Sequence, residues 1–520
     1  MTNPLFLLPR RALLPAAALA LAGCALGRPP AQVEAPVPAH WQAPLPAQAA
    51  PVPGEALPHG GSLASLDQWW RQAGDPLLAE LIDAAQAASP SVSSAAARIA
   101  EARASRVQAG AALAPNLDGT LSATRSASPT SGFGGTGTTG TGTGDTASTG
   151  LGASGAIPAV TVLQAGLQSS WEIDLFGGLR AGRDAAASRL AASEAKWHDA
   201  RVSVAAETAN AYFAERTCAR QLAVAESDTR SRQESARLTQ LSADAGFTAP
   251  ADAALARAGA ADASGRLVQQ RAQCQVLRQG LVALTGLDAQ DLAGKLDARP
   301  ADLALPALHP VSSVPAQTLA QRPDIYAAEL AVAAASAEVG QAQAQRYPRL
   351  SLTGSIGRMQ LRVSGFRETL DTWSVGPVSL TVPIFDGGTR AANAEAARAR
   401  YEEAASQYRA GVRQAVKEVE EALTNLQATD DRTADAERAV KDYQASFDAT
   451  QARYRSGLAS QFELEESRRT LFAAQTARVG LQRERAQAWV SLYRALGGGW
   501  ARPDAPQASS RTAPTDNARP

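Results

Sequence analysis

The chain has 520 residues, of which 5% are aromatic and 19% are charged. Its length predicts about two to four domains, and the shortage of large apolar side chains in an alanine-rich sequence favours close-packed helices over a thick globular interior. Lysine plus arginine and aspartate plus glutamate number 50 each. The basic excess of a nucleic-acid-binding protein is therefore missing, and no nucleic-acid partner is expected.

The first 23 residues have the pattern of a processing signal. Arg10 and Arg11 precede an uncharged, apolar run over 12–23 that ends in "LAGC" at 21–24. The run is shorter than the roughly 20 residues that span a bilayer. It fits the lipobox of a bacterial lipoprotein, in which the cysteine is diacylated on sulfur and becomes the mature N-terminus. We therefore predict a signal peptide over 1–23 and a lipidated Cys24; the alternative is an ordinary secretory signal with a chance cysteine.

The segment 24–62 follows as a tether. It is rich in proline and alanine, a composition typical of a solvated linker without a core. Residue 25 is Ala rather than Asp, which favours sorting to the outer membrane.

The rest of the chain contains a tandem repeat. The Gly-Gly pair at 177–178 aligns with the pair at 387–388 at an offset of 210, and Gly246 aligns with Gly457 at an offset of 211. The first copy carries an additional Gly/Thr-rich tract around 132–155, which is typical of a flexible surface loop. The predicted domains are a first repeat at 63–286, a connector at 287–320, a second repeat at 321–500 and a disordered tail at 501–520.

Each copy follows one plan. A helix, at about 90–112 or 323–346, leads into two alternating segments, a Gly-Gly corner, a very long helix, a break at a glycine and a long returning helix. From Tyr401 to Tyr454, an unbroken 4-3 spacing of small and apolar residues marks a heptad seam. No proline interrupts 388–455, so this helix would be on the order of 100 Å long. A long amphipathic helix in an ordinary bundle is the alternative, although typical globular helices stop near about 20 residues.

The alternating segments predict strands. Leu350, Leu352 and Ile356 alternate with serine and threonine, and residues 165–175 and 378–384 show the same period. Segments of about 10 residues with one apolar and one polar face are typical of membrane-barrel strands, although a half-buried soluble sheet has the same pattern. Two such strands per copy make four, too few to close a barrel, so closure would require several chains.

No catalytic arrangement is present in the sequence. The four histidines are isolated, and no HExxH, P-loop or GxSxG motif occurs. We therefore expect a protein that is not an enzyme, with no cofactor and no metal site.

The combined motifs resemble the TolC-like outer-membrane efflux proteins, in particular the lipoprotein branch that serves resistance-nodulation-division pumps. The resemblance covers nearly the whole mature chain and rests on short stretches that occur in a fixed order. These are "LAGC" at 21–24, "DLFGGLRAG" at 174–182, "QRPDI" at 321–325, "RYPRLSLTGSIG" at 346–357, "VPIFDGGTRAA" at 382–392, "YRSGLASQFE" at 454–463 and "LYRALGGGW" at 492–500.

This resemblance implies a mostly α fold with membrane β-strands. Three chains would pool four strands each into a 12-stranded outer-membrane β-barrel, and their long helical hairpins into a periplasmic α-barrel. The implied corners, where each membrane strand passes into a tunnel helix, lie at Gly177, Gly178, Gly387 and Gly388.

The resemblance also implies a pore aperture at the hairpin tips. Gly246 and Gly457 would make the periplasmic turns, and Tyr454 matches a gate tyrosine. Carboxylates line the aperture in relatives, and the matching positions are Asp252, Glu463 and Glu466. Such a ring would favour cations; the alternative is that these acids only stabilise helix N-termini. The arginine expected two residues after the second glycine is Ala459 here, which leaves the usual latch in doubt.

The remaining cysteines fit the implied hairpin. Cys218 lies 28 residues before Gly246, and Cys274 lies 28 residues after it. Antiparallel helices that turn at this glycine would bring the two side chains level, close enough for a disulfide. We predict that bond; two buried free thiols are the alternative.

The implied function is a passive, trimeric exit duct for drugs or other small molecules. Its partners would be outer-membrane lipid, a periplasmic adaptor protein and an inner-membrane efflux transporter. A periplasmic adaptor lipoprotein and a lipid-anchored enzyme are the competing hypotheses, and the duplicated hairpins argue against the first.

Overall fold

The computed structural model describes residues 27–36, 38, 69–72, 75–127, 159–299, 319, 322–363, 365–500 and 502. The predicted lipidation residue Cys24, the signal at 1–23 and the Gly/Thr-rich tract at 132–155 lie outside these residues.

The chain divides into two compact units, which we describe separately. The sheet unit comprises Met1–Ala31, Ala104–Ala187 and Ala334–Tyr401; the helical unit comprises Gln32–Arg103, Ser188–Ala333 and Glu402–Pro520.

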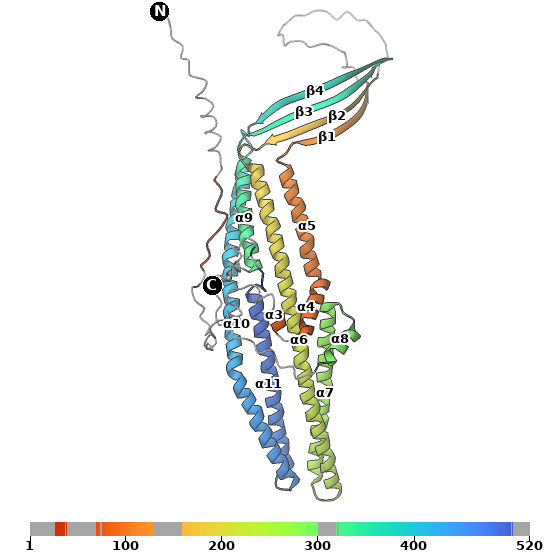
Figure 1. The fold of residues 1–520 in the computed structure, drawn as a ribbon, viewed down its shortest axis with the longest axis vertical. Helices are drawn as coiled ribbons and strands as arrows, with labels where there is room; N and C mark the ends of the chain where they lie inside the picture. The colour runs from red at the N-terminus through yellow and green to blue at the C-terminus, as the bar shows by residue number, and fades with distance from the viewer. Residues whose placement is uncertain are drawn as a thin grey trace, which may run out of the picture. The chain divides into compact units, whose positions relative to one another are not determined.

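The elements follow the predicted plan in both copies (Figure 1). In chain order they are α3 Trp69–Gln72, α4 Pro76–Ala88, α5 Pro90–Ala111, β1 Asn116–Ser126, β2 Val160–Ile173, α6 Gly178–Asp244, α7 Pro250–Thr285, α8 Ala289–Asp297, α9 Pro323–Ala344, β3 Arg349–Val363, β4 Phe366–Thr381, α10 Thr389–Arg455 and α11 Gln461–Ala495.

The sheet unit holds one antiparallel sheet with the strand order β1-β2-β3-β4 (Figure 1). Each copy contributes one pair, and β2 joins β3 with Leu167 opposite Ile356. The alternating segments are therefore strands, as predicted. Within the described residues, β1 and β4 each have a neighbour on one side only, and edge strands of this length present unpaired backbone groups. Large apolar side chains on β4 are open to solvent in the single chain, including Trp373 and Val375.

The helical unit contains two antiparallel pairs, α6 with α7 and α10 with α11 (Figure 1). The first helix of each pair has 67 residues, so the prediction of one uninterrupted helix over 388–455 is confirmed with a shift of one residue. The heptad seam of α10 is buried most completely between Val412 and Thr429. Nearer the turn its burial is uneven: Tyr443, on the same seam, is 43% exposed, whereas Phe447 is buried.

An aromatic core fixes one part of the helical unit. Trp69 stacks on Trp489 with ring centroids 4.8 Å apart, and Trp70 packs on Tyr493 at 4.4 Å. Leu292 of α8 is buried in the same cluster. Packed aromatic pairs contribute about 0.5–1.5 kcal/mol beyond the effect of burial. The alanine-rich chain thus gathers several of its few large side chains where they stabilise this part of the helical unit.

The motifs "QRPDI" and "LYRALGGGW" pack against each other in the structure. Arg322 of "QRPDI" is buried and donates to the Asp324 carboxylate at 2.7 Å and to the Ala495 carbonyl at 3.2 Å. Gly497 of "LYRALGGGW" has φ +81 and leaves no room for a β-carbon, which would lie 3.0 Å from the Arg322 Cα. The glycine therefore permits both the left-handed turn and the close approach.

Among the described residues, no helix combines the length and the apolar character that crossing a bilayer would need.

Candidate functional site

The first Gly-Gly corner uses its two glycines for different reasons. Gly177 has φ +75, a left-handed conformation that favours glycine. Gly178 begins α6 against the end of α9, where an added β-carbon would lie 2.8 Å from the Ala344 Cβ. The corner thus needs backbone freedom at one glycine and a missing side chain at the other.

The second corner turns differently. Gly387 and Gly388 have φ +64 and +87, and no atom of the described chain lies within 4 Å of a β-carbon built on either. Here both glycines serve the turn itself, and neither is needed for packing. The predicted corner residues therefore all lie at strand-to-helix turns, although the two copies build the turn in different ways.

An aspartate caps each long helix, which the sequence analysis missed. Asp174 accepts from the Arg180 backbone N–H at 2.9 Å, and Asp386 accepts from the backbone N–H of Arg390 at 3.0 Å. The hydrogen bond from the Arg390 backbone is the main cause that lowers the pKa of Asp386. Each arginine side chain also contacts its aspartate. The signal was an Asp and an Arg flanking Gly-Gly in both copies.

The hairpin tips contain the same backbone turn twice. Gly246 and Gly457 have φ +78 and +72. The Phe247 N–H donates to the Ser242 carbonyl, and the Leu458 N–H to the Arg453 carbonyl, at 2.8 Å in each case. This six-to-one hydrogen bond beyond a left-handed glycine is the Schellman motif. The positions predicted as periplasmic turns are therefore tight helix ends.

The two returning helices begin differently. At α11, the Ser460 side chain accepts from the Glu463 N–H at 3.2 Å, and Glu463 Oε2 accepts from the Ser460 N–H at 3.0 Å. This reciprocal capping box satisfies two donors at the helix start. At α7, the N-cap is Ala249, which makes no side-chain cap, and Pro250 follows.

The three predicted aperture acids have different surroundings. Glu463 is exposed and holds the capping box, and Glu466 is exposed and pairs with Arg469 at 2.7 Å. Within the part of the chain that the structure describes, the half-buried Asp252 carboxylate has no hydrogen-bond or ion-pair partner. In this single chain Glu463 stabilises its helix end, which is the alternative role considered for it.

The predicted gate tyrosine connects the two hairpins. The Tyr454 hydroxyl lies 3.1 Å from Thr239 Oγ1 of α6, and its ring packs against a cluster of Phe447, Leu464 and Leu471. Arg453 donates to the Leu458 carbonyl at 3.0 Å, so it closes its own turn.

A buried ion cluster lies near this contact, and the sequence analysis missed it. Arg468 of α11 donates to Glu465 at 2.5 Å and to Ser235 Oγ of α6 at 2.9 Å. Arg232 of α6 binds Asp228 at 3.0 Å and also contacts Glu465. Burial lowers the pKa of Arg468, and among the described residues its Nε has no hydrogen-bond partner. The cluster therefore joins α6 to α11 by charge-assisted hydrogen bonds.

The structure joins Cys218 of α6 to Cys274 of α7. The two Cα atoms are 5.5 Å apart, and both side chains are buried. The spacing of 56 residues places the bond across the first hairpin, level on both helices.

The chain belongs to the outer membrane efflux protein family, whose model matches residues 81–287 and 314–498. The pyoverdine export outer membrane protein OpmQ of Pseudomonas putida is 32% identical over 494 residues, which cover 95% of this chain and 98% of OpmQ. The solvent efflux pump outer membrane protein SrpC, also of Pseudomonas putida, is 30% identical, with 93% of this chain and 97% of SrpC covered.

Solved structures agree with these relatives. The outer-membrane channel OprN is 28% identical, with a TM-score of 0.70 over 84% of this chain and 93% of OprN. The outer membrane protein VceC of Vibrio cholerae is 27% identical, with a TM-score of 0.68 over 83% of this chain and 98% of VceC.

The predicted family and fold class are therefore confirmed. The chain is the outer-membrane channel component of an efflux system, and these relatives do not support the periplasmic-adaptor alternative.

Proposed function

We propose that three copies of this chain form one passive duct through the outer membrane and into the periplasm. The observation that carries the proposal is the four-stranded sheet with open edges at β1 and β4. Three such sheets would make 12 strands and remove every edge, which only full closure achieves. The exposed apolar side chains of β4, such as Trp373 and Val378, support a lipid-facing or chain-facing position.

The duct takes its driving force from partners. The sequence contains no nucleotide-binding P-loop, so transport energy comes from an inner-membrane efflux transporter, coupled through a periplasmic adaptor at the hairpin tips. Cys24 is lipidated after removal of 1–23 and anchors the tether at 24–62 in outer-membrane lipid. The cargo is a small organic molecule, since relatives are named for pyoverdine export and solvent efflux.

The aperture lies at the tips and is held by contacts between the hairpins. Tyr454 with Thr239, and Arg468 with Ser235, join α10 or α11 to α6. Asp252, Glu463 and Glu466 supply the local negative charge that favours cations. This supports a closed resting arrangement that opens when the inter-hairpin contacts separate.

Conductance in planar bilayers tests this proposal. We expect small currents from the purified full-length chain, and larger cation-selective currents when Tyr454→Phe and Arg468→Gln are combined. The matched control changes an exposed arginine of α10 that pairs with Asp435, Arg438→Gln, in place of Arg468. A correctly inserted protein that conducts in neither form would contradict the proposal.

A further inference from the structure

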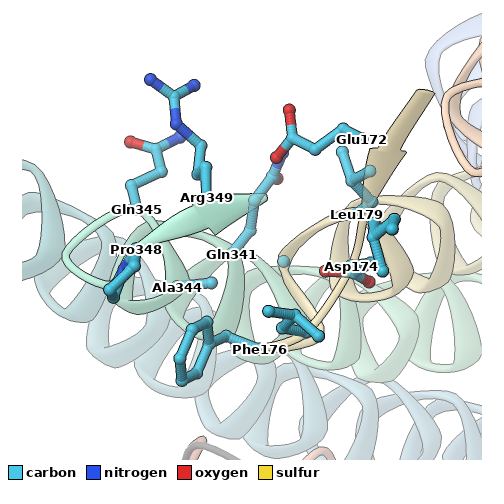
Figure 2. Close-up of a pocket in the computed structure, with 12 residues that line it drawn as sticks. Glu172, Asp174, Phe176, Leu179, Gln341, Ala344, Gln345, Pro348 and Arg349 are labelled. Carbon is cyan, nitrogen blue, oxygen red and sulfur yellow. The ribbon is translucent and has the colours of Figure 1, made fainter. Parts of the chain in front are cut away.

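A small cavity lies at the first corner of the sheet unit, where no function is yet assigned. Its volume is about 150 Å³, and it lies between the end of β2 with the start of α6 and the end of α9 with the start of β3. Figure 2 shows the ends of four polar side chains toward the upper edge of this cavity and the Phe176 ring at its lower edge. The cavity is therefore amphipathic.

The polar side chains of the cavity are not used elsewhere. Within the described part of the chain, Glu172, Gln341, Gln345 and Arg349 make no side-chain hydrogen bond or ion pair. The other charged lining residue, Asp174, is occupied by Arg180. One carboxylate, one guanidinium and two amides thus remain available to a ligand.

The apolar part is held in place by its neighbours. The Phe176 ring stacks on Tyr347 with centroids 4.9 Å apart and an interplanar angle of 25°. Leu179, the second residue of α6, lines the same cavity. A fixed aromatic face can hold another ring by offset stacking.

The strand register places the charged lining residues Glu172 and Arg349 on the polar face of the sheet. Glu172 lies opposite Ser351, while Ile173 lies opposite Leu350. Because side chains alternate between faces, Arg349 shares the face of Ser351 and Glu172, and Leu350 shares that of Ile173. A membrane barrel turns its apolar face to lipid and its polar face to the lumen. In the proposed trimer, the cavity therefore opens to the channel interior.

We propose that this cavity is a contact site for exported molecules, and that it binds an aromatic ring carrying a carboxylate. The ring lies against Phe176, the carboxylate accepts from Arg349 and Gln345, and an amino or hydroxyl group of the ligand donates to Glu172. A cavity of about 150 Å³ holds one benzene-sized ring, so the site takes a small aromatic acid or one such group of a larger cargo. The inference rests on the proposed function, because the lumenal position depends on barrel closure.

A phospholipid headgroup is the competing occupant. Its phosphate and ammonium groups could also pair with Arg349 and Glu172. The register argues against it, because the charged lining residues Glu172 and Arg349 lie on the face opposite that of Leu350, which does not line the cavity.

Binding to the full-length protein in nanodiscs tests the proposal. The probe is p-aminobenzoate, followed by saturation-transfer NMR and titration, with glycerophosphoethanolamine as the lipid-derived arm. We expect saturable p-aminobenzoate binding that Arg349→Gln weakens by at least about tenfold, the loss expected for a charge-assisted hydrogen bond. Phe176→Leu should weaken p-aminobenzoate binding, because it removes the aromatic face against which the ring lies. Glu172→Gln should weaken binding of p-aminobenzoate more than binding of benzoate, which has no amino group to donate.

The matched control is Arg346→Gln, which removes an exposed arginine that does not line the cavity. It should leave binding unchanged. Equal losses in the Arg346 and Arg349 variants, absence of saturable binding, or binding of glycerophosphoethanolamine alone would each overturn the proposal. Conductance of the same preparation separates the two proposals: a conducting channel that does not bind the probe refutes only the cavity assignment.

Discussion

The two helical hairpins have the same turn but different links between their helices. Both turn at a left-handed glycine with a Schellman hydrogen bond. The first is crossed by the Cys218–Cys274 disulfide. The aligned positions of the second are Thr429 and Arg485, and there Arg485 pairs with Asp430 at 3.0 Å. Arg432 also pairs with Glu484 at 2.7 Å. At this level one hairpin is thus held covalently, and the other by ion pairs that salt and motion can break.

The N-termini of the two returning helices also differ, and here the second hairpin has the additional interaction. The second hairpin begins its return with a capping box, and the first with an uncapped Ala249 followed by proline. In the second hairpin, local hydrogen bonds therefore order the tip. In the first hairpin, the disulfide limits separation of the two helices. One duplicated backbone is thus stabilised at its tip in one copy and along its length in the other.

The largest effect should come from the cluster that joins the hairpins. Arg468→Met leaves Ser235 without its buried partner and leaves Glu465 with Arg232 as its ion-pair partner, and we expect a loss of about 3 kcal/mol, the lower end for breaking a buried ion pair. Thermal unfolding followed by circular dichroism measures it. Arg469→Met, one residue away and 73% exposed in its side chain, should cost less than about 1 kcal/mol. Equal effects would mean that the cluster does not link the hairpins.

Removing the disulfide should come next. Cys218→Ser with Cys274→Ser should lower stability by about 2–4 kcal/mol, as for other disulfides that close long loops. Intact-mass measurement after alkylation without reductant should find neither cysteine modified in the native chain. Alkylation of both would show free thiols instead. Arg485→Gln removes the ion pair with Asp430 at the matching level of the second hairpin. For a partly exposed pair we expect a loss of stability of about 0–1 kcal/mol.

The turn glycines should respond alike in both hairpins. Gly246→Ala and Gly457→Ala each force a β-carbon into the left-handed region, at a cost of about 1–2 kcal/mol. Gly280→Ala is the control, because it lies inside α7 with nothing within 4 Å and should be neutral or stabilising. A clear difference in melting temperature between the two turn variants would show that the two tips are not equivalent.

The smallest effect concerns the caps. Ser460→Ala should lose about 1 kcal/mol, and Ala249→Ser should gain a similar amount if the new hydroxyl caps α7. Amide hydrogen exchange in the first turns of α11 and α7 measures these changes locally. Unchanged exchange in both variants would show that capping does not distinguish the hairpins.

Much of the fold could be predicted because its signals are periodic. The heptads of α10, the alternation around Leu350 and Ile356, and the repeated glycines each have a direct structural meaning. The Arg468–Glu465 cluster could not be predicted, because a charged residue on a long helix usually lies on a solvated face, and only packing against α6 shows it buried. Gly178 was predicted as a corner residue, but its close packing against Ala344 could not be predicted, because it depends on how α9 ends.

The central claim is that the sheet closes only between chains, and cross-linking across its edges tests it most directly. In one chain β2 and β3 separate β1 from β4, so the edges are about 14 Å apart at three strand spacings, beyond the roughly 5.5 Å that a disulfide needs. Thr120→Cys would be combined with a cysteine at each position of 369–375 in turn, and membranes oxidised. We predict that at least one pair yields dimers and trimers of the chain. If every pair leaves the membrane-inserted chain monomeric, the account is wrong.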